Sequence, residues 1–197
     1  MPPATLRLLA PGQYRRTPWK NGGGVTVDIA DAYRDGIASP GWDGMLWRFG
    51  HTRIERNGPF SDLSGFDRLL AVIDGSGLVL HPAGAQALDV RAPFRPVRFP
   101  GEWAIVSELT SGAVGVLNLM ADRQGFEIDL EFVRGRRVVA AKAGIYLAYA
   151  LVGGALVRVD GFSQPVPAGH TLRVDAGATV TIEVEDELVA LATIRPR

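Results

Sequence analysis

The stretch FEIDLEF at residues 126–132 decides the fold class, because apolar and acidic residues alternate along it without a break. Its four apolar side chains would lie on one face of an extended strand, since successive side chains of a strand point to opposite faces. The segments VTVDI at residues 25–29 and VTIEV at residues 180–184 show the same period. This alternation is typical of half-buried strands in antiparallel sheets.

The remainder of the chain agrees with this interpretation. The 24 glycines and 13 prolines are spread along the whole sequence, where they predict turns between strands rather than one linker. Only residues 62–67 suggest a helix, and that segment is short. The sequence therefore predicts an all-β protein.

A weak internal repeat predicts how the strands are organised. The first copy reads LLAVIDGSGLVL at 69–80 and FRPVRFPGEW at 94–103, and the second reads LAYALVGGALVRV at 147–159 and FSQPVPAGHT at 162–171. Each copy predicts a strand, a glycine-containing hairpin, a second strand and a Pro-Gly or Pro-x-Gly turn. We expect two fused β-barrel lobes, one over residues 1–135 and one over 136–197, with strands that can cross between them.

Composition excludes several classes of function. The 197 residues include 21 Lys plus Arg and 21 Asp plus Glu, and this balance argues against nucleic acid or an anionic membrane as a partner. The cluster Arg134, Arg136 and Arg137 lacks interleaved aromatic residues and predicts a solvated turn. The absence of cysteine excludes disulfides, thiolate metal sites and thiol nucleophiles.

The sequence also favours a cytoplasmic protein. The first twelve residues contain three prolines and no sustained apolar run, unlike a secretory signal, and no stretch approaches the roughly 20 apolar residues that span a bilayer. The chain is compatible with a homodimer.

The two repeats resemble the cupin superfamily, and this resemblance implies a double-stranded β-helix (jelly-roll) of the bicupin type. Metal cupins place two His and a Glu before the first hairpin glycine, and a third His after a Pro-x-Gly. Registered on Gly75, the Glu position falls on Arg68, and the paired His fall on Ser61 and Leu63 or on Asp62 and Ser64. The corresponding position of the Glu in the second copy is Tyr146, and the late His positions are Ala104 and Leu172.

This register predicts that the protein binds neither a metal nor another cofactor. The three histidines, His51, His81 and His170, share no ligand spacing. A guanidinium at the position of a carboxylate ligand repels a cation, and its fork of donors suits a carboxylate or phosphate. We therefore expect Arg68 to bind an anion.

A second candidate anion site is the segment WKNGGG at residues 19–24. Lys20, Asn21 and Gly22 belong to a run in which successive backbone N–H groups can converge on an anion. The alternative is a glycine-rich hairpin with an exposed lysine.

Six motifs in unchanged order resemble the HutD/Ves family: W-K-N-G-G-G-x-T, W-R, G-P-F-S, G-x-D-R, F-P-G-E and N-L-M-x-x-R, between Trp19 and Arg123. The resemblance implies a link to bacterial histidine utilisation and, for the HutD branch, binding of an intermediate such as N-formylglutamate that restrains the pathway. The Ves branch is associated with stress. The implied ligand-binding residues are Lys20, Asn21, Gly22, Arg48, Ser61, Arg68, Asn118 and Arg123. The chain departs from the family pattern at Val116 and Leu117 and at residues 49–52.

The residue types agree with a site for a small anionic metabolite, since the arginines and Lys20 supply positive charge while Asn21 and Asn118 suit an amide or formamide. In the alternative, Arg48 and Arg68 pair with Asp28, Asp62 or Asp67 to stabilise the fold.

We expect no catalytic residues. A metal-independent isomerase, epimerase or hydrolase is the second hypothesis, with acid–base candidates His51, Asp28, Glu102 and Tyr146. A module that only binds a partner is the third.

Overall fold

The computed structural model describes residues 4–18, 24–35 and 42–197, and the chain divides into two compact units. Unit 1 combines the chain up to Tyr14 with Phe126–Arg197, and unit 2 is Arg15–Gly125. In the described ranges the chain forms strands, turns and one 3-10 turn, η1 (Pro11–Gln13), so the all-β prediction is confirmed. No helix in these ranges is long and apolar enough to cross a membrane.

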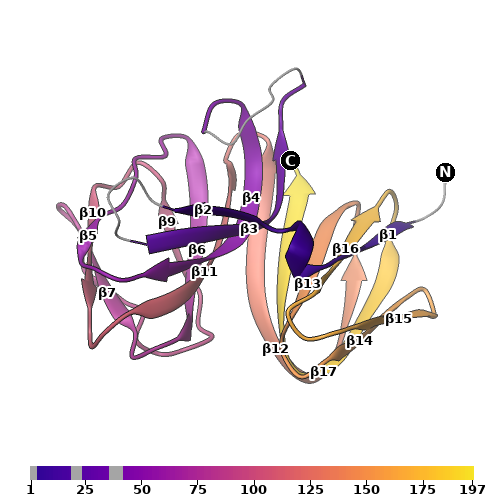
Figure 1. The fold of residues 1–197 in the computed structure, drawn as a ribbon. Helices are drawn as coiled ribbons and strands as arrows, with labels where there is room; N and C mark the ends of the chain where they lie inside the picture. The colour runs from indigo at the N-terminus through magenta and orange to yellow at the C-terminus, as the bar shows by residue number, and fades with distance from the viewer. Residues whose placement is uncertain (1–3, 19–23, 36–41) are drawn as a thin grey trace. The chain divides into compact units, whose positions relative to one another are not determined.

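Unit 1 contains one antiparallel sheet, of order β1-β16-β13-β17-β14-β15, in which β12 also pairs with β17 (Figure 1). Its strands are β1 (Ala4–Leu9), β12 (Phe126–Ala141), β13 (Gly144–Val152), β14 (Ala155–Val159), β15 (Phe162–Val166), β16 (Thr171–Ala176) and β17 (Val180–Pro196). The first strand, β1, pairs with β16 over its whole length, from Ala4 opposite Ala176 to Leu9 opposite Thr171. The start of the chain therefore belongs to the same sheet as its last strands.

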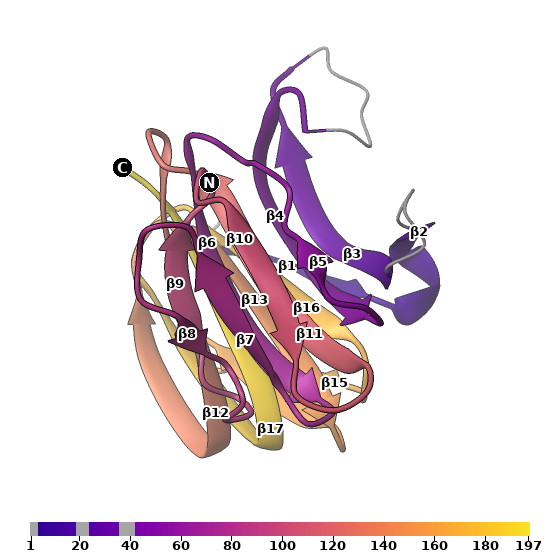
Figure 2. The same cartoon turned by 90° about the vertical axis from the view of Figure 1, so that its left-hand side faces the viewer.

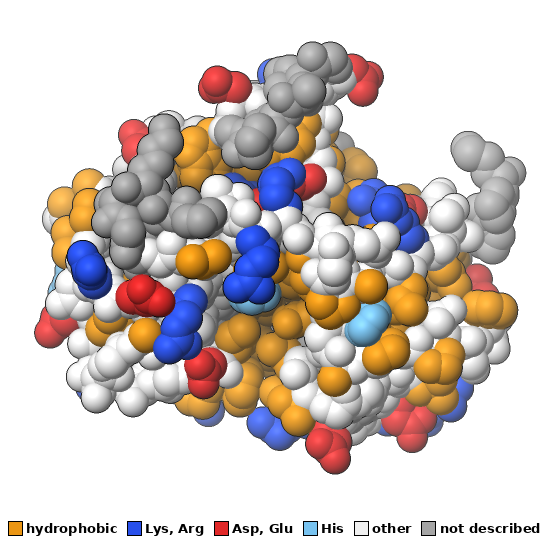
Figure 3. All heavy atoms as spheres, viewed as in Figure 1, with side chains coloured by type: hydrophobic (Ala, Val, Ile, Leu, Met, Phe, Trp, Pro, Cys, Tyr) orange, Lys and Arg blue, Asp and Glu red, His pale blue; other side chains and the backbone are white. Residues whose placement is uncertain are grey.

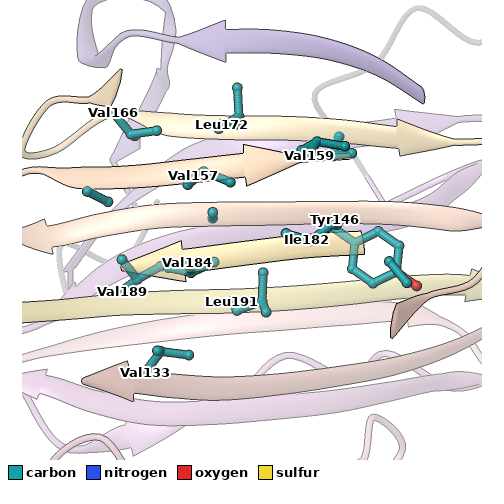
Figure 4. Close-up of a cluster of buried hydrophobic side chains, with 14 of the residues drawn as sticks. Val133, Tyr146, Val157, Val159, Val166, Leu172, Ile182, Val184, Val189 and Leu191 are labelled. Atoms are coloured by element: carbon teal, nitrogen blue, oxygen red, sulfur yellow. The ribbon is translucent and has the colours of Figure 1, made fainter. Parts of the chain in front are cut away.

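The interior of unit 1 is almost entirely aliphatic. Figure 4 shows side chains such as Val157, Leu172 and Leu191 packed together, with the ring of Tyr146 at one side of the cluster. Each fully buried aliphatic side chain contributes about 1.5–3 kcal/mol through removal of its surface from water. This cluster explains why unit 1 needs no disulfide or metal.

Unit 2 contains two antiparallel sheets (Figures 1 and 2). The large sheet has the order β2-β3-β4-β11-β6-β9, and the small sheet has the order β5-β10-β7-β8. The large sheet is formed by β2 (Arg15–Pro18), β3 (Gly24–Tyr33), β4 (Met45–Ile54), β6 (Phe66–Asp74), β9 (Val97–Pro100) and β11 (Val114–Asp122). The small sheet is formed by β5 (Gly58–Pro59), β7 (Leu78–Pro82), β8 (Leu88–Asp89) and β10 (Ile105–Leu109).

One face of the large sheet packs against the small sheet, and we call it the interior face. Leu70, Val72 and Val116 of the large sheet form one buried cluster with Leu80 and Ile105 of the small sheet. Because side chains alternate along a strand, every second residue of β4, β6 and β11 points into this cluster. Polar residues that share this parity must therefore lie in the interior of unit 2.

The glycine-containing connections in the two repeats are not hairpins. β6 and β7 belong to different sheets, and β13 and β14 are separated by β17. At Gly75, with φ of 88°, an added Cβ would lie 2.6 Å from the carbonyl oxygen of Ala113. The glycine thus permits a close turn that carries the chain from one sheet to the other. Period-two patterns predict strands but not their partners, which explains the error.

Strand β12 corrects one further expectation. Residues 134–137 are exposed as predicted, but they lie within this strand and not in a turn. The register against β17 shifts between Val133 and Gly135, where Gly135 has φ of 71°. The sequence-based boundary at residue 135 falls at this irregularity, whereas the contacts divide the chain after Gly125.

The helix suggested for residues 62–67 is also absent, since these residues form a turn and the start of β6.

Candidate anion-binding site

Arg48 and Arg68 lie in one cross-strand row on the interior face of the large sheet. Met120 of β11 is directly opposite Arg48 of β4 on one side and Arg68 of β6 on the other. The row continues to Phe99 of β9, which is opposite Arg68. The side chains of residues directly opposite each other on one face are neighbours, so the sheet brings both arginines into the interior of unit 2.

Arg68 is a buried cation without a carboxylate partner. Its exposed fraction is 8%, and no carboxylate of the described residues lies within 4.0 Å of its guanidinium. The Nη1 atom donates one long hydrogen bond of 3.5 Å to the backbone carbonyl of Ser61, and the buried Nε atom has no hydrogen-bond partner. Burial lowers the pKa of Arg68 to about 10 because it disfavours the charged form. An unpaired buried charge of this kind requires an explanation.

Two aromatic rings give Arg68 its only close electrostatic support among the described residues. Its Cζ atom lies 5.1 Å from the ring centroid of Phe60 and 5.1 Å from that of Phe99. The two centroids are themselves 6.4 Å apart, so the two rings are neighbours beside the guanidinium. A cation over an aromatic face is stabilised by the ring quadrupole, by about 2 kcal/mol when desolvated.

The backbone around Gly101 keeps the two rings at Arg68. Leu63 donates its N–H to the carbonyl of Gly101 at 2.9 Å, and Gly101 donates to the carbonyl of Phe66 at 2.8 Å. An added Cβ at Gly101 would lie 2.2 Å from the Leu63 carbonyl oxygen, so no larger residue permits this approach. Phe60 is fixed from the other side, since its N–H donates to the carbonyl of Ile105 at 2.8 Å. The Gly-Pro-Phe-Ser and Phe-Pro-Gly-Glu motifs thus enclose one residue, Arg68.

Arg48, in contrast, has a carboxylate partner. Its Nε atom donates a short hydrogen bond to Asp28 Oδ1, and both side chains are buried. Arg15 donates to the other oxygen of Asp28 at 2.9 Å and to Asp31 at 2.6 Å, while the Arg48 guanidinium lies 5.1 Å from the Trp42 ring centroid. For Arg48, the structural alternative considered from the sequence is therefore correct, and its partner is Asp28.

Asn118 adds a neutral polar group to the same face. Its Nδ2 atom donates to Thr52 Oγ1 at 3.4 Å, and Thr52 shares a hydrogen bond of 3.2 Å with Thr26. Asn118 is two residues before Met120, and it therefore lies diagonally across from both Arg48 and Arg68. Diagonal neighbours on one face are about 7–8 Å apart, which is within the reach of a small ligand.

Arg123 does not lie with these residues. Its guanidinium donates to Asp67 at 2.6 Å, to both oxygens of Glu102 at 2.9 Å, and to the carbonyl of Phe66 at 2.9 Å. Asp67 points to the opposite face of β6 from Arg68, as predicted from its adjacent position. The two carboxylates lower the availability of Arg123 for an anion, and they raise its pKa further above its ordinary range. Arg123, which follows β11, is thus bound to β6 and to the turn after β9. Its partner Asp67 lies on the face of β6 opposite to Arg68.

The other predicted residues are distributed as follows. Ser61 is exposed and contributes its backbone carbonyl to Arg68. Lys20, Asn21 and Gly22 lie outside the described residues. Across residues 4–18, 24–35 and 42–197, no group of three or more His, Asp or Glu side chains could hold a metal ion.

The candidate acid–base residues are not brought together. His51 points to the opposite face of β4 from Arg48, and burial together with Arg16 lowers its pKa. Glu102 is exposed and bound to Arg123, Asp28 is held by two arginines, and Tyr146 lies in the core of unit 1.

On the surface, charges are commonly paired, as in Arg34 with Asp122, and Figure 3 shows acidic and basic side chains side by side over the viewed face.

Sequence reasoning missed the aromatic pair Phe60 and Phe99. Both belong to motifs that were recognised, but aromatic residues beside Pro and Gly in an all-β chain are usually core residues. The signal that could have identified them is the alternation of Phe99 with Pro100 and of Arg68 with Asp67, which places Phe99 and Arg68 on buried faces. The pairing of β6 with β9 was not predictable from that alternation.

Comparison with known proteins places the chain among a group of bacterial relatives. The model of the HutD family matches residues 12–192. A 21.2 kDa protein of the region 3′ of hutC in Pseudomonas putida is 34% identical over 145 residues, which are 74% of this chain and 73% of that protein. Protein Ves of Cronobacter sakazakii is 28% identical over 136 residues, which are 68% of this chain and 70% of the relative.

Solved structures show the same relationship. HutD from Pseudomonas fluorescens SBW25 has a TM-score of 0.82 and 27% identity, and the match covers 98% of this chain and 100% of that one. A cupin 2 conserved barrel domain protein from Leptotrichia buccalis has a TM-score of 0.52 and 11% identity, with 88% and 89% covered. The second likeness concerns the fold alone, and it confirms that the fold is cupin-like.

Proposed function

Since the chain belongs to the HutD family, as the match over residues 12–192 establishes, we propose that the interior of unit 2 binds a small anionic metabolite at Arg68 in a non-catalytic, regulatory role related to histidine utilisation. The observation that carries the proposal is the buried guanidinium with an unpartnered Nε atom. A bound anion would supply the missing partner and neutralise the charge, which removes the main electrostatic penalty of the site.

The class of ligand follows from the neighbouring groups. A carboxylate suits Arg68, and a formamide or amide suits the diagonal Asn118 and the hydroxyl of Thr52. A compound similar to N-formylglutamate combines these groups. The link to histidine utilisation rests on the family and on the relative from the hutC region of Pseudomonas putida.

We also propose that the two units are two cupin lobes of a bicupin. Two observations support this arrangement: the turn glycines Gly75 and Gly153 both have positive φ, of 88° and 71°, and Arg68 and Tyr146 precede them at the same distance along the chain. On this proposal unit 2 carries the ligand site and unit 1 carries none.

A thermal-shift titration with N-formylglutamate tests the function. The ligand should stabilise the wild-type protein, and Arg68→Met should abolish that stabilisation, because a charge-assisted contact is worth about 1.5–3 kcal/mol. Arg91→Met is the matched control, since Arg91 is exposed and pairs with Asp89. A ligand response that is unchanged in Arg68→Met, or absent from the wild type, would refute binding at this residue.

A further inference from the structure

Among its described residues, the interior of unit 2 contains one positive charge more than its carboxylates neutralise. Among the described residues, the buried charged side chains are Asp28, Arg48 and Arg68. Asp28 and Arg48 form a pair, and the adjoining Arg15 is matched by Asp31. Only Arg68 remains without a carboxylate, so the buried charge that a ligand can compensate is a single one.

The geometry of Arg68 also limits where an anion can bind. The Nη1 atom is directed to the Ser61 carbonyl, and the ring centroids of Phe60 and Phe99 each lie 5.1 Å from the Cζ atom of the guanidinium. The Nε atom is the buried donor without a partner. One carboxylate that accepts from Nε and its neighbouring Nη2 in the plane of the guanidinium would form the bidentate arrangement that arginine favours.

We propose that this site selects a ligand with one singly charged carboxylate and an otherwise uncharged body; this inference rests on the proposed function and adds the charge of the ligand to it. The side chains of β11 nearest to Arg68 on the interior face agree with it, since Met120 opposite and Asn118 on the diagonal are both uncharged. A second carboxylate would approach Arg48, whose charge Asp28 already neutralises.

The physical reason for the selection is desolvation. One carboxylate and Arg68 together have no net charge, so their mutual attraction offsets the loss of water around both. A second buried carboxylate, or a phosphate dianion, would leave a negative charge that no unpaired cation of the described residues compensates. The site therefore favours a neutral group, such as an amide, at the far end of the ligand.

Isothermal titration calorimetry of the full chain with two matched probes tests the inference. N-formylglutamine and N-formylglutamate have nearly the same shape, but the first has one carboxylate and the second has two. We expect N-formylglutamine to bind the wild type more tightly than N-formylglutamate does, because the second carboxylate of N-formylglutamate must be buried beside no unpaired cation of the described residues. In Arg68→Met both affinities should fall about ten- to a hundredfold, while Arg91→Met should leave both unchanged.

The outcomes separate the two proposals. If N-formylglutamate binds as tightly as N-formylglutamine or more tightly, and both depend on Arg68, a second cation reads the second carboxylate and the one-charge inference is wrong while the anion site stands. If the wild type binds neither probe, or if Arg68→Met binds both as the wild type does, the proposed function is itself wrong, and the inference with it.

Discussion

Arg68 in unit 2 and Tyr146 in unit 1 hold the same place in the two repeats, and their surroundings differ in one respect. Tyr146 is 2% exposed, packs in the aliphatic cluster of unit 1, and donates its hydroxyl to the carbonyl of Lys142 at 3.0 Å. Its only polar group is therefore satisfied within the unit. Arg68 is almost as buried, but its charge and its Nε atom have no partner among the described residues.

The contrast extends to the whole interior of each unit. Among the described residues, the buried polar side chain of unit 1 is the uncharged Thr171, whereas unit 2 buries the charged side chains Asp28, Arg48 and Arg68. Burying unpaired charge reduces stability, so it persists where it has a use. On the proposed function, unit 2 gives up some stability for a binding site, whereas unit 1 does not.

The largest expected effect breaks the charge balance of unit 2. Asp28→Asn leaves Arg48 buried without a carboxylate, and we expect the free energy of unfolding to fall by about 3–5 kcal/mol. Chemical denaturation measures the loss. Asp31→Asn is the control, because Asp31 is partly exposed and pairs with the partly exposed Arg15, and it should lower stability by less than about 1 kcal/mol.

Hydrogen exchange then locates the effect. Backbone amides of β3 and β4 should lose protection in Asp28→Asn, whereas those of β13 and β16 in unit 1 should retain it. Equal loss in the two units would show that they do not differ in the way that the comparison states.

A smaller effect of opposite sign is expected at Arg68. Burial depresses the pKa of Arg68, so protonation of this guanidinium penalises the folded state. The penalty is absent at pH values above the ordinary arginine pKa, and it is complete once the pH has fallen through about 10. At neutral pH the charged guanidinium therefore opposes folding, by on the order of 3 kcal/mol. Arg68→Met removes this penalty, together with the contacts to Phe60 and Phe99.

We accordingly expect Arg68→Met to raise the free energy of unfolding at pH 7 by about 1–3 kcal/mol in the absence of ligand. Urea denaturation of the ligand-free protein measures the change, and Arg91→Met serves again as control. A loss of stability in Arg68→Met would mean that this arginine is a structural residue, which would remove the contrast with Tyr146.

The extent to which the sequence predicts these features differs between local and long-range properties. Alternation predicted the strands that contain residues 25–29, 126–132 and 180–184, because that pattern depends only on neighbouring residues. The pairing of β1 with β16 joins the two ends of the chain, and no local pattern encodes it. For the same reason β6 and β7 were expected in one hairpin, although they lie in different sheets.

The candidate site shows the same limit. Motif order singled out Arg48 and Arg68 together, but only the register of β3 against β4, with its irregularity between Asp28 and Ala30, decides that Asp28 reaches Arg48. Arg68 has no acidic residue at the corresponding place, since its cross-strand neighbours are Met120 and Phe99. The difference between a paired and an unpaired arginine thus depends on strand partners, which sequence spacing does not supply.

The smallest expected effect concerns the one tyrosine that ties β1 to the remainder of unit 1. The Tyr14 hydroxyl donates to the carbonyl of Gly169 at 2.9 Å and shares a hydrogen bond of 3.0 Å with Thr171, so Tyr14→Phe should lower stability at pH 8 by about 1 kcal/mol. Burial raises the pKa of Tyr14 to about 12, although the bond to Thr171 acts in the other direction. The stabilisation is therefore complete below the ordinary tyrosine pKa and is lost as the pH rises through about 12.

Urea denaturation at several pH values between 8 and 11.5 should then show the wild type and Tyr14→Phe converging, because only the wild type must keep this phenol protonated to remain folded. Thr171→Val, combined with Tyr14→Phe in a double-mutant cycle, isolates the bond between the two side chains. A difference that stays constant over the whole pH range would mean that the hydroxyl of Tyr14 is solvated. In that case unit 1 would not satisfy its polar groups internally, and the distinction from unit 2 would rest on Arg68 alone.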